Sequence, residues 1–137
     1  MMGVMVNYLA VLAAAVASIA LGMVWYGPLF GKVWMRLSGF TPKSMKQMRL
    51  TAGQAMGLGT LVTLVMAYVV AVLLNLLSVV SFAGAAKLAV LLWLGLSLPL
   101  VLGGFLWENK PFALVALNAA YRLVELLVIA AVIVAMG

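Results

Sequence analysis

The sequence predicts an all-α membrane protein: a bundle of four transmembrane helices with a short interfacial helix between the first two. Hydrophobic residues make up 69% of the 137 residues and charged residues only 7%, whereas about a quarter of the residues in a soluble domain are charged. Four apolar stretches each exceed the ~20 residues that a helix needs to cross ~30 Å of hydrocarbon. This length suits a single transmembrane domain, residues 1–137.

The four predicted spans cover about residues 4–26, 55–77, 82–107 and 112–136, and a longer segment, residues 27–51, separates the first two. No Lys or Arg precedes the first span, and its apolar run is longer than that of a signal peptide. We therefore expect the first span to be retained.

Basic residues predict the orientation of the chain in the membrane. The segment between the first two spans carries five Lys or Arg side chains, whereas the N-terminal tail, the turn near Ser78–Ser81 and the C-terminus carry none. Loops rich in Lys and Arg stay on the cytoplasmic side. We expect this basic loop, residues 27–51, in the cytoplasm and both termini outside the cell membrane.

A short amphipathic helix is predicted after the first span, where the Gly27-Pro28 step breaks the helix. Apolar residues then recur at positions 30, 33, 34 and 37, with Lys32 and Arg36 on another side, a pattern typical of a helix that lies in the membrane interface. Gly39 can end this helix, and the step at positions 41–42, Thr-Pro, can begin a second one that runs into the next span.

Aromatic and basic side chains near this surface are expected to contact lipid headgroups: Trp25, Tyr26, Lys32, Trp34, Arg36, Lys43, Lys46 and Arg49. Each cation near an anionic surface contributes ~1 kcal/mol of attraction. Anionic lipids are therefore the expected partner of this segment, and attraction of an anionic solute or a regulatory lipid is the alternative. The chain offers no separate basic domain to hold nucleic acid.

Small residues at four-residue spacing predict tight helix packing in the first two spans. They are Ala10, Ala14, Ser18 and Gly22 in the first span, and Gly59, Thr63, Ala67 and Ala71 in the second. Such ridges let helix backbones approach closely, which matters in lipid because no hydrophobic force drives helices together there. A solute path lined by small residues is the alternative interpretation.

The third span is expected to kink near its centre. Pro99 cannot donate a hydrogen bond to the carbonyl of Gly95, so that acceptor needs another partner at bilayer depth. A packing kink is one interpretation, and a hinge or binding site is the other.

The last span carries a row of polar residues on one helix face. Asn118, Arg122 and Glu125 fall at i, i+4 and i+7, with Tyr121 beside them. A lone charge at the bilayer centre costs at least ~2.5 to 3.5 kcal/mol, whereas opposite charges neutralise each other. We expect Arg122 and Glu125 to pair, within the helix or between two subunits. Candidate partners at similar depth are Ser18, Thr63, Ser97 and the Gly95 carbonyl.

Several residue types that enzymes use are missing from the chain. It contains no Cys and no His, and its only acids are Glu108 and Glu125. Thiolate and imidazole chemistry are therefore excluded, and a carboxylate pair is implausible within one chain. We predict that the protein is not an enzyme and that it holds no metal and no cofactor.

Three segments resemble a known family. They are Asn7-Tyr8-Leu9, the string W-Y-G-P-L-F-G-K-x-W at residues 25–34, and L-N-A-A-Y-x-L-V at residues 117–124. These segments are similar to a family of small prokaryotic four-span membrane proteins catalogued as a domain of unknown function. The resemblance implies four spans and a prokaryotic membrane, and it carries no activity or ligand.

The polar row leaves two classes of function open. The first is transport or permeation of a small solute or ion through a homo-oligomer, with Asn118, Tyr121, Arg122, Glu125, Gly95 and Pro99 lining the pathway. The second is a structural or accessory membrane subunit in which the pair of Arg122 and Glu125 is an assembly clasp. Transport is the preferred hypothesis, and a small bundle with much apolar surface favours a homo-oligomer in either case.

Overall fold

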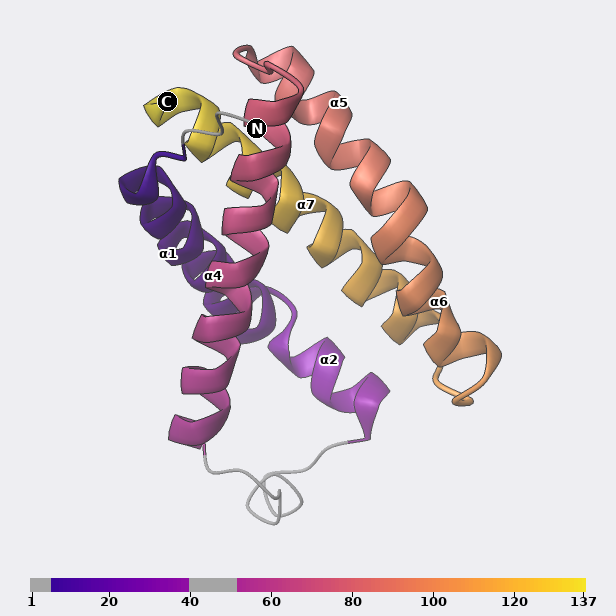
Figure 1. Ribbon diagram of the computed structural model, residues 1–137. Coiled ribbons are helices and arrows are strands. Elements are labelled where there is room, and N and C mark those ends of the chain that lie inside the picture. Colours follow the sequence, from indigo (N-terminus) through magenta and orange to yellow (C-terminus); the bar gives the residue numbers. More distant parts are fainter. Residues whose placement is uncertain (1–5, 40–51) are drawn as a thin grey trace.

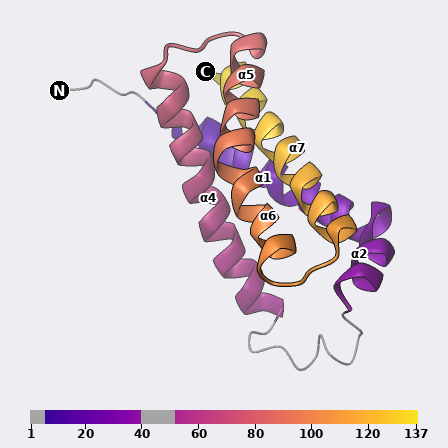
Figure 2. The same cartoon turned by 90° about the vertical axis from the view of Figure 1, so that its right-hand side faces the viewer.

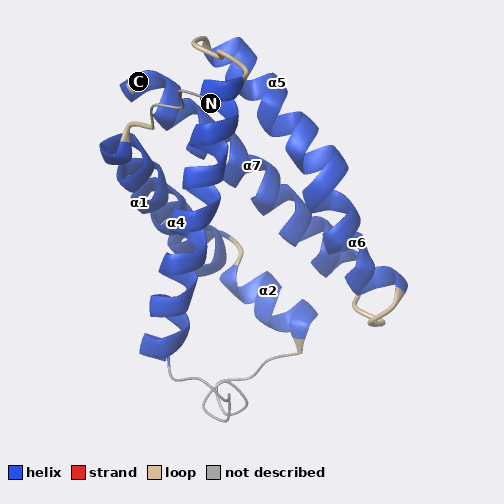
Figure 3. Ribbon diagram, in the orientation of Figure 1, coloured by secondary structure: helices blue, strands red, loops and turns tan. Residues whose placement is uncertain are grey.

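The computed structural model describes residues 6–39 and 52–137, and within those ranges its regular secondary structure is helical throughout (Figures 1 and 3). The predicted all-α fold class is confirmed. The elements in chain order are α1 (Tyr8–Val24), η1 (Trp25–Leu29), α2 (Gly31–Ser38), α4 (Ala52–Leu76), α5 (Phe82–Leu92), η2 (Trp93–Ser97), α6 (Leu98–Leu106) and α7 (Phe112–Met136).

Four helical runs in the described part of the chain are long and apolar enough to cross a membrane. They cover Tyr8–Leu29, Gly53–Leu76, Phe82–Leu106 and Phe112–Met136. The protein is therefore a multi-pass membrane protein, with spans close to those predicted.

The connections between spans gather at two opposite ends of the bundle. The N-terminal end of α1, the turn between α4 and α5 and the C-terminus lie together at one end, which we call the terminal end (Figures 1 and 2). The helix α2 and the turn between α6 and α7 lie at the other, which we call the α2 end. This arrangement agrees with an even number of crossings.

The last helix, α7, is the central element. It contacts α1, α4, α5 and α6, and its buried side chains are distributed along most of its length. The core is made largely of small residues, with Ala10, Ala14 and Ala130 almost fully buried. Small side chains let the helices pack closely.

The two predicted packing ridges are only partly used. In α1, Ala10, Ala14 and Ser18 are buried. In α4, Ala67 and Ala71 are buried, whereas Gly59 is exposed and Thr63 donates a hydrogen bond to the Gly59 carbonyl of its own helix. The prediction of packing is therefore wrong for Gly59 within one chain, because the buried residues of α4 lie in its terminal half.

The other half of α4 is exposed around its whole circumference. Every residue from position 53 to 62 is exposed, and Figure 1 shows this part of α4 standing away from the other ribbons. It includes large apolar side chains such as Leu58 and Leu61. Within the described chain, this is the longest helical stretch that is exposed on all sides.

The short helix α2 matches the predicted amphipathic helix. It ends at Ser38, followed by Gly39 in the left-handed conformation with φ of 78°. Lys32 and Arg36 are exposed, whereas Val33, Trp34 and Leu37 are half-buried. The predicted headgroup residues Lys43, Lys46 and Arg49 and the second helix start at positions 41–42 lie outside the described residues.

The third span is irregular where a kink was predicted. The helix widens into a π turn, η2, in which the N–H of Leu98 donates to the carbonyl of Trp93, five residues earlier. A π turn is a common way to absorb an interruption such as Pro99. The indole N–H of Trp93 donates to the Ala119 carbonyl at 2.8 Å, which fastens this turn to α7.

Candidate functional site

The centre of the candidate site is the carboxylate of Glu125, which lies where α7 packs against α1. One of its oxygens, Oε2, accepts hydrogen bonds from Ser18 Oγ at 2.6 Å and Tyr121 Oη at 3.0 Å. The side chain is 3% exposed. The ridge of small residues on α1 explains this position, because Ser18 continues the ridge one turn after Ala14 and supplies a hydroxyl there.

Arg122 pairs with Glu125 inside the same helix. Its Nη1 lies 2.6 Å from Glu125 Oε1, at i,i+3 spacing. The structure therefore closes the predicted ion pair within one subunit. The two partners have different surroundings, since the side chain of Arg122 is 44% exposed.

Tyr121 joins the pair to α1. Its ring lies beneath the guanidinium, with Arg122 Cζ 5.4 Å from the ring centroid, within cation–π range. Its hydroxyl fits against Gly22, where an added Cβ would lie 2.9 Å from Tyr121 Oη. Gly22 therefore makes room for the hydroxyl that reaches Glu125.

Tyr26 and Trp25 belong to this site, although the sequence indicates lipid headgroups for both. Tyr26 Oη donates to Asn118 Oδ1 at 2.7 Å, and its ring lies edge-on to Tyr121 at 5.1 Å. The ring of Trp25 lies 5.9 Å from that of Tyr121. The cause is η1, a π turn with a non-helical Gly27, which turns both rings towards α7. Sequence reasoning places them only by their depth in the membrane.

One polar atom in this aromatic cluster lacks a hydrogen bond. Trp25 Nε1 is buried and has no hydrogen-bond partner among the described residues. Buried polar groups are normally satisfied, so the indole N–H marks a point where the packing around Tyr121 favours ring contacts over hydrogen bonding.

A cavity of about 300 Å³ opens beside this cluster, towards the α2 end. Its wall is formed by Tyr26, Leu100, Val101, Gly104, Glu108, Lys110, Val115, Asn118 and Arg122. Asn118 and Arg122 were predicted, and they do share one surface. The cavity explains why the guanidinium is half-exposed while its carboxylate partner is dry.

The α6 side of the cavity was not predicted. Gly104 leaves space there, and an added Cβ would lie 3.1 Å from Lys110 Cδ. The N–H of Lys110 donates to the Gly104 carbonyl at 2.9 Å, and Lys110 Nζ lies 3.1 Å from Glu108 Oε2. The signal in the sequence was the Gly103-Gly104 step close to a charged turn.

Gly95 and Pro99 do not reach the polar cluster. Both are exposed, and neither lines the cavity. Their predicted place in the pathway needs correction, because the residues of the third span that line the cavity are Leu100, Val101 and Gly104 of α6. Of the candidate partners of the polar row, Ser18 is the one that contacts it.

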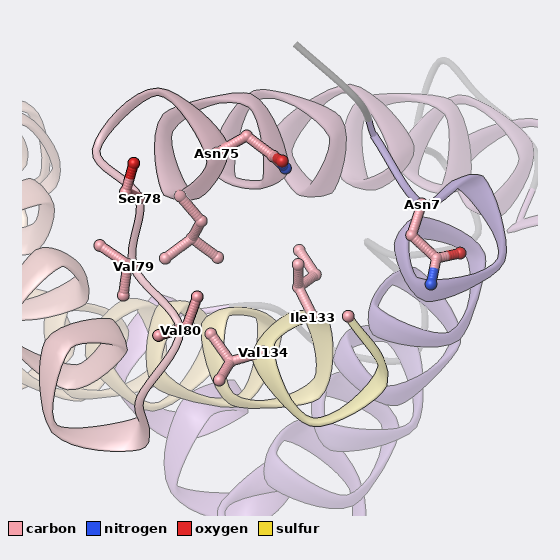
Figure 4. Close-up of a pocket in the computed structure, with 9 residues that line it drawn as sticks. Asn7, Asn75, Ser78, Val79, Val80, Ile133 and Val134 are labelled. Atoms are coloured by element: carbon pink, nitrogen blue, oxygen red, sulfur yellow. The ribbon is translucent and has the colours of Figure 1, made fainter.

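A second cavity, of about 420 Å³, lies at the terminal end (Figure 4). Figure 4 shows Asn75 of α4 and Ser78 of the following turn on one side and Ile133 and Val134 of α7 on the other. Asn7 also lines it, and its amide donates to the Met136 carbonyl at 3.1 Å. α7 therefore contributes to a cavity at each end of the bundle.

The two cavities are separated by a dry layer. Between them lie Ser18 of α1 and Glu125, Ile129 and Ala130 of α7, all at most 2% exposed. Between Arg122 and Ile133 the helix rises ~16 Å at 1.5 Å per residue. A solute would therefore have to pass this layer to move from one cavity to the other.

The described residues bring no three His, Cys, Asp or Glu side chains together that could hold a metal ion. The expectation that the protein holds no metal and no cofactor stays a prediction.

A family model described as "Protein of unknown function (DUF1761)" matches residues 9–134. No curated protein and no solved structure matches the chain.

Proposed function

Because the chain belongs to the DUF1761 family of proteins of unknown function, we propose from its own geometry that it moves a small polar solute or ion across the membrane. The solute enters the cavity beside Arg122 and passes along α7. The observation that carries the proposal is the 44% exposed side chain of Arg122 in the wall of a polar cavity. A charged side chain within a transmembrane segment that borders a cavity is typical of a solute or ion pathway.

The second cavity supports movement across the membrane rather than binding alone. Carriers expose one site to each side in turn, with a closed layer between. The layer of Ser18, Glu125 and Ile129 lies between the two cavities. Its ion pair and hydroxyl contacts are polar interactions that can rearrange without exposing an unpaired charge to lipid.

The direction of this pathway follows from the basic residues. We place the α2 end, with Lys32 and Arg36 on the exposed side of α2, in the cytoplasm, and both termini outside, in a prokaryotic cytoplasmic membrane. The cavity beside Arg122 then opens towards the cytoplasm. Anionic headgroups are the expected partners of α2.

A homo-oligomer remains part of the proposal. The exposed half of α4 carries Gly57 and Gly59, and nothing described lies within 4 Å of a Cβ added at either. A second copy could pack closely on these small residues. In such an oligomer, the Gly59→Cys variant should form disulfide-linked dimers in membranes. The natural chain has no Cys, so any such cross-link must involve position 59.

The alternative function is a structural or accessory membrane subunit. It is favoured by the same uncovered half of α4, which could receive a different protein, and by the contact of Glu125 with Ser18, which clasps α7 to α1. This function requires a copurifying partner protein and no solute flux.

Cysteine labelling tests the proposed pathway in a chain that contains no natural Cys. We expect Asn118→Cys, in the cavity, to react with a charged, membrane-impermeant methanethiosulfonate in inside-out vesicles. The control Ile129→Cys lies in the dry layer and should not react.

Flux is measured on the same variants in liposomes, as osmotic swelling in iso-osmotic potassium acetate, potassium chloride or urea, with valinomycin present so that K⁺ can accompany a transported anion. Labelling of Asn118→Cys should slow the swelling that the unlabelled protein supports. Reconstituted protein that admits none of the three solutes, yet copurifies with a second membrane protein, would favour the accessory subunit.

A further inference from the structure

We propose that the cavity beside Arg122 takes a small oxyanion, a carboxylate or a phosphate, held by the guanidinium of Arg122 and the side-chain amide of Asn118. This inference rests on the proposed function, because it names the class of solute that enters the same cavity.

The first argument is the set of donors that Arg122 keeps. A guanidinium has five N–H donors and no acceptor. The described contacts with Glu125 use Nη1 alone, which leaves Nε and Nη2 for another partner. Since the carboxylate is 3% exposed and does not line the cavity, a solute there meets the guanidinium and not the acid.

The second argument is the orientation of Asn118. Its Oδ1 accepts the hydroxyl hydrogen of Tyr26 at 2.7 Å. The acceptor end of the amide is therefore occupied, and the Nδ2 hydrogens remain as donors. The only O–H group of Tyr26 donates this hydrogen bond. The inner wall thus offers the N–H donors of Arg122 and Asn118, and the side-chain oxygen of Asn118 is already bonded.

The third argument concerns charge at the mouth of the cavity. Lys110 and Glu108 lie there as an ion pair with 3.1 Å between Nζ and Oε2, and both side chains are more than half exposed. Glu108 is the acid that lines this cavity, and its charge is matched by Lys110. A cation would meet the guanidinium deeper in the cavity and be repelled, whereas an acceptor-rich anion would be bound.

The volume sets the size of the anion. At about 300 Å³ the cavity lies at the lower end of the ~300–1,000 Å³ range of small-molecule sites. Arg binds both carboxylates and phosphates through its planar fork. The same chemistry is available from a free anion or from the phosphate of an anionic lipid headgroup, and the experiment has to separate these sources.

Binding is tested on purified full-length protein in phosphatidylcholine nanodiscs with radiolabelled acetate, inorganic phosphate and acetamide as probes. Acetamide is the uncharged analogue of acetate. We expect saturable binding of acetate or phosphate and at least tenfold weaker binding of acetamide. The control variant is Lys87→Gln, which removes an exposed cation that does not line this cavity and should leave binding unchanged.

The decisive variant is the double substitution Arg122→Gln with Glu125→Gln. It removes both charges together, so no unpaired charge is left in the core. We expect at least a tenfold loss of anion binding with an unchanged size-exclusion profile. Where the double variant does not fold, Arg122→Lys replaces it, because Lys keeps the charge and loses the fork; the same loss is expected.

The lipid source is examined by adding phosphatidylglycerol to the nanodiscs. A headgroup occupant would compete with labelled phosphate and appear by native mass spectrometry as a retained lipid that the double variant loses. No competition would identify a free anion; either result supports the oxyanion site.

Equal binding of acetamide and acetate, unchanged in the double variant, would overturn the oxyanion and leave the proposed transport intact. Absence of binding by all three probes, with no labelling of Asn118→Cys and no flux, would overturn both.

Discussion

Glu125 is a buried acid, and both of its carboxylate oxygens have partners within its own chain. Arg122 neutralises one oxygen, and the hydroxyls of Ser18 and Tyr121 donate to the other. An isolated charge at the centre of a membrane costs at least ~2.5 to 3.5 kcal/mol. The three donors offset this cost and also fix α7 against α1.

Replacing Ser18 with Ala should destabilise the bundle. The substitution removes one donor to a carboxylate that is 3% exposed, and a hydrogen bond to a charged group contributes about 1.5–3 kcal/mol. We expect a clear fall in the apparent melting temperature in detergent. Ser97→Ala is the matched control, because Ser97 is half-exposed in η2 and has no described contact with the cluster. Equal melting temperatures for the two variants would contradict the role of Ser18.

Gly22→Ala tests the fit between α1 and Tyr121. The added Cβ would lie 2.9 Å from Tyr121 Oη, so the hydroxyl must move away from Glu125 and stability should fall by about 1–3 kcal/mol. Gly103→Ala is the control, because its Cβ would meet nothing within 4 Å and Ala is favoured in a helix by up to ~1 kcal/mol. In thermal unfolding followed by size exclusion, the apparent melting temperature should therefore fall for Gly22→Ala and stay equal or rise for Gly103→Ala. A stabilised Gly22→Ala variant would refute the close contact.

At the scale of elements, α7 forms the common wall of the molecule. Its first half faces the cavity beside Arg122, its middle packs dry against α1, and its end borders the second cavity. The polar residues occupy only the first two of these regions. A single helix therefore carries the exposed and the buried part of the site one turn apart.

The π turn η2 is bonded to α7 through one indole, in addition to the packing of α5 and α6 on that helix. Trp93 Nε1 donates to the Ala119 carbonyl at 2.8 Å, so Trp93→Phe should lose about 0.5–1.5 kcal/mol from the hydrogen bond and a further amount from the smaller ring. The control Trp107→Phe changes an indole that is 86% exposed. The measurement is the fraction of protein that remains monodisperse after heating, and it should fall for Trp93→Phe alone.

Sequence spacing was sufficient to predict some of these elements and insufficient for others. The four apolar runs and the i, i+4, i+7 row predicted the spans and the shared surface of Asn118 and Arg122, because helical periodicity is local. Ser18 was one of four candidate partners chosen by depth, and the sequence did not show which of the four contacts Glu125. The cavity wall of Val101 and Gly104 was not predicted, because the π turn rotates the end of the third span by an amount that no local pattern encodes.

At the scale of the whole molecule, the arrangement of the two ends gives a prediction about orientation. Val80 lies in the turn after α4, at the terminal end, and is 87% exposed; Lys32 is exposed on α2. In whole cells, an impermeant thiol reagent should label Val80→Cys, whereas Lys32→Cys should react only after lysis. The reverse pattern would place the α2 end outside and invert the proposed pathway.

The divergence of α4 is a property of the whole bundle that the sequence did not reveal. The ridge from Gly59 to Ala71 consists of small residues throughout, yet only Ala67 and Ala71 of this ridge are buried. Which part of a ridge is used depends on the crossing angle with α1, and that angle is set by side chains far apart in the sequence. Tyr26 shows the same dependence on tertiary structure, since its bond to Asn118 forms across 92 positions.

The position of both charges on one helix has a consequence for how the protein enters the membrane during synthesis. A span with a lone Glu carries an extra free-energy cost of insertion until another span supplies a counter-charge. Here Arg122 and Glu125 lie three residues apart. The two charges of α7 can therefore neutralise each other when this helix enters the lipid, before it packs against α1. Ser18 of α1 then adds a hydrogen bond to a pair that α7 brings with it, so the counter-charge of Glu125 does not have to come from another span.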